Sequence, residues 1–188
     1  MMRCFVAIDI DEGIRSRIGQ LQQQLQKCIS ADRFGIKWVD PELMHLTLKF
    51  AGEVSDRDIS ELCAIVDEVA GKHKGFSVDV TGLGYFGATP RVAWVGVDSS
   101  PELAELQKEL DERLSMTGLA PEDNKAFHGH LTLCRVKNYK AGRELQHQLD
   151  DYGAVELGTQ EVDTIYVYSS ELTKQGPIYT VVSSCKLK

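Results

Sequence analysis

Two periods of apolar residues alternate along the chain. Runs that are apolar throughout, or apolar at every second residue, indicate strands, and apolar residues three or four apart indicate amphipathic helices. Strands are expected at residues 3–10, 36–39, 45–50, 76–86, 91–98, 130–135, 162–169 and 178–187. Helices are expected at about 12–30, 59–70, 101–114 and 141–150.

Local signals refine two of these helices. Ser100 followed by Pro101 is typical of a helix start, because the serine hydroxyl can cap the first turn and proline tolerates its first position. The glutamine run 22–24 lies inside the first predicted helix. We predict that these glutamines lie on its solvated face.

The order of the elements indicates the fold class. Several consecutive strands are joined by short turns, which favours antiparallel pairing, and helices stand between the others, so the class is α+β. Strand–helix–strand units in both halves of the chain suggest a duplicated architecture. We therefore expect residues 1–188 to form a single domain made of two lobes, with a cleft between them.

Composition narrows the class of protein. The 188 residues are 43% hydrophobic and 26% charged, as in ordinary globular proteins. No apolar run approaches the roughly 18 residues that a membrane span needs, and the N-terminus does not resemble a signal peptide. Five cysteines without a CxxC pair indicate reduced thiols and a cytoplasmic location.

The charge of the chain limits how it could meet a nucleic acid. The formal net charge is −7, and the sequence pI is about 5.2. A protein that binds long nucleic acid through its phosphates is normally basic. If this protein recognises nucleic acid, we therefore expect it to bind a small piece of it, locally, in a pocket.

One tetrapeptide occurs twice. The chain reads HLTLKF at residues 45–50 and HLTLCR at residues 130–135. A half-buried strand would explain the alternation of polar and leucine positions. It would not explain why histidine and threonine recur at the same places, 85 residues apart.

The alternation places the polar residues of each copy together. Side chains two residues apart on a strand point to one face, so His45 and Thr47 share a face, with Lys49 next along it. The leucines and Phe50 are expected in a core on the other face. His130 and Thr132 share a face in the second copy.

These residue types suit a phosphate. Two histidines can exchange protons near neutral pH, one as acid and one as base. Two hydroxyls and a nearby cation, for which Lys49 is a candidate, suit an anionic tetrahedral group. Two histidines without carboxylates make a poor zinc site, so no metal or other cofactor is expected.

The two motifs and the segments around them resemble those of a known family. The paired motifs resemble those of the 2H phosphoesterase superfamily, and more closely the RNA 2′,3′-cyclic phosphodiesterases, also called the 2′-5′ RNA ligase family. The resemblance extends to WVDPELMHLTLKFAGEV, GLGYFGATPRVAWVGV and SSELTKQGPIYTVV, so it runs nearly end to end. It implies two antiparallel sheets that line a central cleft, with helices packed outside.

The resemblance also implies an activity and its residues. It implies hydrolysis of 2′,3′-cyclic phosphate RNA ends to 2′-phosphomonoesters without a metal. His45 would protonate the leaving 3′ oxygen and His130 would activate water. Thr47, Thr132 and Arg135 would bind the phosphate. The substrate would be an RNA end, tRNA fragments included, or a small cyclic phosphate, and the protein is expected to be a monomer.

Two residues need a particular geometry to take part. Strict alternation puts Arg135 on the face away from His130, so it reaches the phosphate only if the strand bulges or ends near Cys134. His128 lies two residues before His130 and is a further candidate for the same face.

Three functions are compatible with these motifs. The first is the cyclic phosphodiesterase. The second is another reaction of the superfamily, namely 2′-5′ RNA ligation or cleavage, or hydrolysis of a small cyclic nucleotide or of ADP-ribose cyclic phosphate. The third is an RNA-end binding protein, which would not need two proton-transferring histidines.

Overall fold

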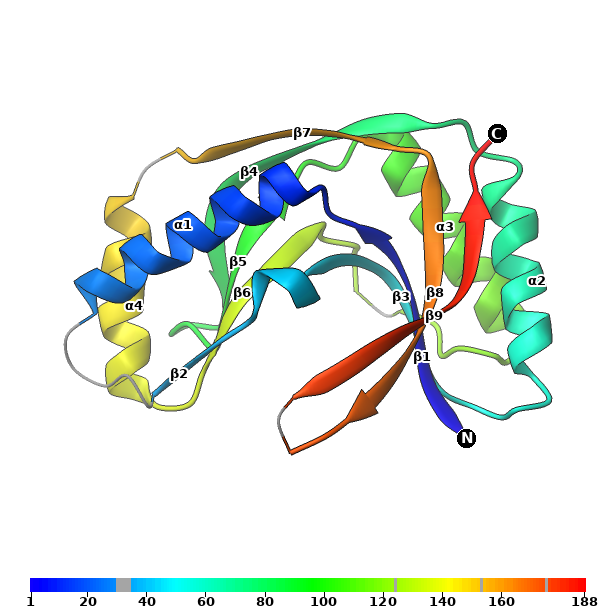
Figure 1. Cartoon of the computed structure of the whole chain (residues 1–188), viewed down its shortest axis with the longest axis horizontal. Helices are drawn as coiled ribbons and strands as arrows, with labels where there is room; N and C mark the ends of the chain where they lie inside the picture. Colours follow the sequence, from blue (N-terminus) through cyan, green and yellow to red (C-terminus); the bar gives the residue numbers. More distant parts are fainter. Residues whose placement is uncertain (30–34, 124, 153, 175) are drawn as a thin grey trace.

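Four helices and nine strands make up the described part of the computed structural model, which covers residues 1–29, 35–123, 125–152, 154–174 and 176–188 (Figure 1). The strands are β1 (Met2–Asp9), β2 (Ile36–Trp38), β3 (His45–Val54), β4 (Phe76–Phe86), β5 (Val92–Val97), β6 (His130–Val136), β7 (Glu156–Val162), β8 (Thr164–Leu172) and β9 (Pro177–Lys186). The helices are α1 (Glu12–Cys28), α2 (Ile59–Ala70), α3 (Pro101–Met116) and α4 (Tyr139–Asp151), with a 3-10 turn at Pro41–Leu43.

The strands form two antiparallel sheets, which confirms the predicted α+β class. One sheet has four strands in the order β3-β1-β8-β9, and the other has five in the order β2-β6-β5-β4-β7. Helices α2 and α3 pack against the four-stranded sheet, and α1 and α4 lie over the five-stranded one. Each sheet therefore buries one face under helices and holds one copy of the HLTL sequence, in β3 and in β6.

The two halves of the chain are interlocked. Strand β4 follows the first copy but pairs with β7, which follows the second copy, and β8, which also follows the second copy, returns to pair with β1. Strand β2, which precedes the first copy, pairs with β6, which carries the second. Neither sheet is therefore built from one half of the sequence, and the ladder between β2 and β6 joins the segment before the first copy to the strand that carries the second.

One strand was not predicted from the sequence pattern. Residues 156–162 form β7 on the edge of the five-stranded sheet, and the chain passes into β8 of the other sheet at Asp163. Gly158, and the polar Gln160 at a buried position, interrupt the apolar alternation of this segment. The pattern therefore showed one strand where the structure has two.

The predicted start of the third helix is confirmed. Ser100 Oγ accepts a hydrogen bond from the backbone N–H of Leu103, and Pro101 occupies the first helical position. Leu103, Leu106 and Leu110 form a fully buried stripe along this helix. Within the residues that the structure describes, no helix is long and apolar enough to cross a membrane.

Candidate active site

The two copies of HLTL have the same burial pattern. In β3 and in β6 the histidine and the threonine are half-buried, and both leucines are buried under the helices. Residues of β3 and β6 come within 8 Å of each other, measured between Cα atoms. The prediction that histidine and threonine share the face opposite to the leucines is therefore confirmed in both strands.

Each strand bulges at the same place. In β6, Thr132 pairs with Trp94 and Cys134 pairs with Ala93, so Leu133 is an extra residue. In β3, Thr47 pairs with Ala7 and Lys49 pairs with Val6, so Leu48 is the extra one. A bulge resets the alternation of side chains along the strand that contains it. As a result, two consecutive residues are buried in each strand: Leu48 and Lys49, Leu133 and Cys134.

A buried glutamine supports each bulge. Gln107 of α3 donates from Nε2 to the carbonyl of Leu48 (3.4 Å), and Gln22 of α1 donates to the carbonyl of Leu133 (3.0 Å) and to that of Val39 (2.8 Å). The prediction that Gln22 lies on the solvated face of its helix is wrong, since its side chain is 4% exposed. Its spacing from Ile18 and Leu25 places it on the apolar stripe, a signal that could have indicated this burial.

The bulge brings Arg135 to the face that carries the second histidine. Arg135 is exposed, its charge acts on His130, and the same charge reaches Tyr179 in β9 of the other sheet. Burial raises the pKa of Tyr179, and the charge of Arg135 opposes this rise. The guanidinium therefore lies near both sheets, and the geometry that Arg135 needed in order to take part is present.

The same bulge removes Lys49 from the first histidine. The expectation that Lys49 shares a face with His45 is wrong: its side chain is fully buried on the helix-covered side. There Nζ forms ion pairs with Asp111 and with Asp123 (2.9 Å), and it donates to the carbonyl of Pro121 (2.5 Å). Phe50 was expected in the core, but the reset alternation leaves it 61% exposed.

The backbone fixes the orientation of both imidazoles. His45 Nδ1 lies 3.0 Å from the carbonyl oxygen of Leu43, and His130 Nδ1 lies 2.7 Å from that of His128. A carbonyl oxygen only accepts, so each Nδ1 carries the proton. In both histidines Nε2 is therefore the nitrogen that remains available to exchange a proton with a substrate.

Aromatic rings enclose His45. Its ring stacks on Phe5 with the centroids 4.6 Å apart, and the edge of Tyr179 meets it at 5.1 Å. Burial lowers the pKa of His45; the bond to the Leu43 carbonyl and the charge of Asp9 oppose this effect, and Arg15 adds to it. Asp9, which pairs with His45 in the sheet, is thus a nearby carboxylate that favours the charged imidazole.

His130 has different neighbours. Its ring meets Phe86 edge to face, with the centroids 5.0 Å apart, and stacks against His128 at 6.1 Å. Burial lowers the pKa of His130, the bond to the His128 carbonyl opposes this, and the charges of His128 and Arg135 lower the pKa further. Burial, together with the charges of His128 and Arg135, therefore holds the imidazole of His130 toward its neutral form.

His128 and Trp94 extend the site along the five-stranded sheet. The exposed ring of His128 meets Trp94 at 4.7 Å, and the indole lies so close over Gly84 that a Cβ there would come within 2.3 Å of it. Trp94 and Phe86 thus form an aromatic surface beside His130. Other aromatic residues that could have offered such a surface pack against the core instead: Trp38, Tyr85 and Phe127.

Two hydroxyls complete the arrangement. Among the residues that the structure describes, neither Thr47 nor Thr132 has a hydrogen-bond partner for its side chain. Both are half-buried next to a histidine on the same face of their strand. The described residues contain no group of three or more His, Cys, Asp or Glu side chains that could hold a metal ion.

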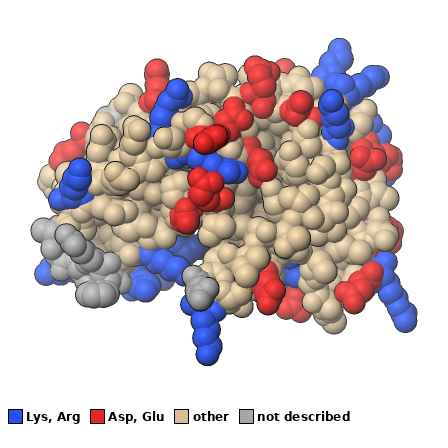
Figure 2. Space-filling view, viewed as in Figure 1, with Lys and Arg blue, Asp and Glu red and all other residues tan. Residues whose placement is uncertain are grey.

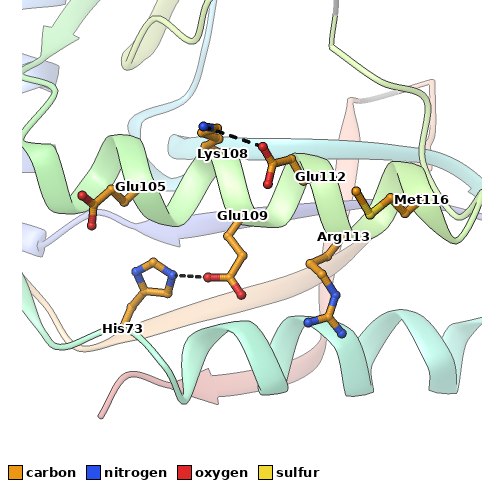
Figure 3. Close-up of a pocket in the computed structure, with 7 residues that line it drawn as sticks. All are labelled: His73, Glu105, Lys108, Glu109, Glu112, Arg113 and Met116. Atoms are coloured by element: carbon orange, nitrogen blue, oxygen red, sulfur yellow. Dashed lines mark hydrogen bonds and ion pairs between the residues drawn. The ribbon is translucent and has the colours of Figure 1, made fainter.

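A separate hollow lies far from these motifs. It has a volume of about 450 Å³ and lies beside α3 on the outer side of the four-stranded sheet (Figure 3). Four of the charged residues that line it form two pairs: His73 Nε2 lies 2.9 Å from Glu109, and Lys108 lies 3.8 Å from Glu112. Neither copy of HLTL contributes a residue to this hollow, so it is not a candidate for the active site.

The fold and the site together define a class of protein. Two sheets hold two imidazoles with available Nε2 atoms, two hydroxyls and a guanidinium, a set suited to acid–base chemistry at a phosphate. The family model described as "LigT like Phosphoesterase" matches residues 8–94 and again residues 95–179, one match for each half of the chain. The chain belongs to this LigT-like family of 2H phosphoesterases.

Individual relatives agree with this assignment. An RNA 2′,3′-cyclic phosphodiesterase of Thermotoga maritima is 37% identical over 100% of this chain and 96% of its own length. One of Aquifex aeolicus is 36% identical over 88% of each chain. A crystal structure from Thermus thermophilus superposes with a TM-score of 0.81 at 26% identity, over 99% of this chain and 98% of that one.

Proposed function

We propose that this protein hydrolyses 2′,3′-cyclic phosphate ends of RNA to 2′-phosphomonoesters, by acid–base catalysis with two histidines and without a metal. The observation that carries the proposal is the matched pair of imidazoles. Each is bound through Nδ1 to the carbonyl two residues earlier, so each has Nε2 available. The activity in the names of the full-length relatives supports the same reaction.

His130 acts as the base in this proposal, and His45 acts as the acid. His130 Nε2 takes a proton from water, and the water oxygen forms a bond to phosphorus. The bond from phosphorus to the 3′ oxygen breaks, and His45 Nε2–H gives its proton to that oxygen. The positive neighbours of His130 and the carboxylate of Asp9 beside His45 support this division of roles.

Three side chains bind the phosphate in this proposal. The hydroxyls of Thr47 and Thr132 donate to its non-bridging oxygens, and Arg135 neutralises the charge that develops on them. His128 is a fourth contact, on the outer side of His130. Lys49 has no such part, because its ammonium group is occupied on the buried side of β3.

We further propose that the chain acts as a monomer in the cytoplasm, as one domain in which each lobe carries one motif. The interlocked pairing of β2 with β6, β4 with β7 and β8 with β1 supports a single folding unit. None of the five cysteines, three of which are buried, forms a disulfide in the part of the chain that the structure describes, as is usual for proteins of a reducing compartment. The partner is an RNA that ends in a 2′,3′-cyclic phosphate.

Product analysis tests this proposal. A short RNA with a 2′,3′-cyclic phosphate end is incubated with the protein in EDTA, and the product is examined by phosphorus NMR. The expected result is complete conversion to a single 2′-phosphomonoester. A need for added metal, or a mixture of 2′- and 3′-phosphates, would contradict the mechanism. Turnover confined to mononucleotides or to 2′-5′ linkages would point to another reaction of the superfamily.

A further inference from the structure

A second cation lies directly beside Arg135. In the register of the five-stranded sheet, Lys37 of β2 pairs with Arg135 of β6, so the two side chains emerge from neighbouring strands on the same face. Both are exposed, and neither has a side-chain partner among the residues that the structure describes. Like charges directly opposite each other destabilise a sheet. An anion bound between or beside them would remove this repulsion.

Further cations continue from this pair toward the end of the sheet. Arg91 and Lys137 line a hollow of about 370 Å³ between the turn at residues 87–91 and the start of α4. Backbone hydrogen bonds hold this region together: Val136 N–H donates to the carbonyl of Arg91 (2.8 Å), and Lys137 N–H donates to that of Gly35 (2.7 Å). The cations are therefore placed by the sheet itself and not by a long loop.

Several cations elsewhere in the molecule are neutralised by acidic side chains. On the four-stranded sheet and its helices, Lys72 and Arg113 pair with acidic side chains, as does the buried Lys49. In the described residues the side chains of Lys37, Arg91 and Lys137 have no acidic partner. Among the described residues drawn at the lower left of Figure 2, near β2 and the end of β6, Lys and Arg but no Asp or Glu are visible. These described residues therefore form a local positive surface on a chain with a net charge of −7.

We infer that this surface, which includes Lys37, Arg91 and Lys137, binds the RNA strand on the 5′ side of the cyclic phosphate, and that Lys37 contacts its first phosphodiester. Arg135 would hold the reacting phosphate, and Lys37 is its neighbour on the side away from β5. The inference rests on the proposed function and narrows its substrate to an oligoribonucleotide. It agrees with the expectation from net charge that a small piece of nucleic acid is bound locally, and it extends that piece beyond the terminal nucleotide.

Comparing two substrates tests this inference. One is a nucleoside 2′,3′-cyclic phosphate, which has no phosphodiester on the 5′ side, and the other is an RNA tetranucleotide with the same terminal nucleotide. The measured quantity is the ratio of their kcat/KM values, tetranucleotide over mononucleotide. Lys37→Ala should lower this ratio about three- to tenfold, and Lys37→Glu should lower it further, because the first removes and the second reverses a charge that faces a phosphate.

Lys74→Ala and Lys74→Glu are the matched controls. Lys74 is an exposed lysine between α2 and β4, on the other lobe, and changing it should leave the ratio within twofold of the unaltered protein. The salt dependence provides a second measure. The slope of log(kcat/KM) for the tetranucleotide against log salt should become shallower by about 0.7 for each phosphate that the variant no longer neutralises. The double variant of Arg91→Ala and Lys137→Ala should change the slope in the same direction.

If the ratio of kcat/KM values is the same for Lys37→Glu as for Lys74→Glu, the inference is wrong, although the proposed function still stands. If neither substrate is turned over, the proposed function fails, and binding decides the inference separately. The probe is then a 5′-fluorescein tetranucleotide that ends in a 2′-phosphate, followed by anisotropy. Weaker binding to Lys37→Glu than to Lys74→Glu would support the surface, and equal binding would overturn it.

Discussion

Strands β3 and β6 begin with the same four residues and bulge at the same place, yet they present different groups to the site. After the bulge, the first copy buries Lys49 and exposes Phe50. The second copy buries Cys134 and exposes Arg135. The bulge decides which of the following residues turns to which face. The two residues after HLTL, Lys49 and Phe50 in one copy and Cys134 and Arg135 in the other, therefore determine whether the cation is buried or exposed.

The difference gives the two histidines unlike electrostatic surroundings. His45 lies among aromatic rings and next to Asp9, whose charge favours its protonated form. His130 lies next to Arg135 and His128, whose charges favour its neutral form. Burial is the largest cause of the lowered pKa of both histidines, and the charge of Asp9 opposes it at His45 whereas the charges of His128 and Arg135 add to it at His130. The repeat supplies two similar sites, and their surroundings distinguish them.

The largest expected effect comes from removing either imidazole. His45→Ala and His130→Ala should each lower turnover of a cyclic phosphate by about 10²–10⁴-fold, the usual contribution of a positioned acid or base. Initial rates with purified variants measure this, and circular dichroism checks that both still fold. His147→Ala on the surface of α4 is the control, since its ring pairs only with Asp151 in the described residues. Near-normal turnover in either site variant would contradict the two-histidine mechanism.

The residues after the two bulges should differ in their effect on phosphate binding. Arg135→Ala should raise KM for a cyclic phosphate by about 10–100-fold, because the phosphate loses a charge-assisted hydrogen bond. Phe50→Ala, at the equivalent place in β3, should change KM less than threefold. Steady-state kinetics of both variants make this comparison. Equal effects would mean that the two copies bind the phosphate alike.

The residues buried behind the two bulges should differ in their effect on stability. Lys49→Met should lower the free energy of unfolding by about 2 kcal/mol, because Asp111 loses its partner in a partly buried place. Cys134→Ala, at the equivalent position, should cost about 1 kcal/mol through poorer packing. Urea denaturation measures both, with Lys74→Met as a control expected within about 0.5 kcal/mol of the unaltered protein. A Lys49→Met variant as stable as the control would show that the ion pair contributes nothing net.

The smallest effects concern the pKa values of the two histidines, and they should have opposite signs. Asp9→Asn removes a charge that favours protonated His45, so the pKa of His45 should fall further below its ordinary value of about 6.5. Arg135→Gln removes a charge that disfavours protonated His130, so the pKa of His130 should rise. NMR titration of the imidazole resonances measures both. Shifts of the same sign in the two variants would contradict the contrast between the strands.

Much of the fold follows from local pattern. The periods of apolar residues predicted the four helices and eight of the nine strands, since burial of one face repeats at a fixed spacing in each element type. The ninth strand, β7, was not predicted, because a glycine and a buried glutamine occupy positions where apolar residues would have indicated a strand. The shared face of histidine and threonine in each motif also followed from alternation alone.

The sequence by itself determined that two His-x-Thr strands exist and that their leucines are buried. Only the tertiary structure decided which of the residues after each HLTL sequence share a face with the histidine and the threonine. The residues at each bulge bond to side chains that are far away in the sequence, which the local alternation cannot indicate. Gln22 donates to the carbonyl of Leu133, 111 positions away, and Lys49 pairs with Asp111, 62 positions away. Arg135 and Lys37 likewise become neighbours only when β2 pairs with β6. Alternation is a property of neighbouring residues, whereas register and bulges are fixed by hydrogen bonds between segments far apart in the chain.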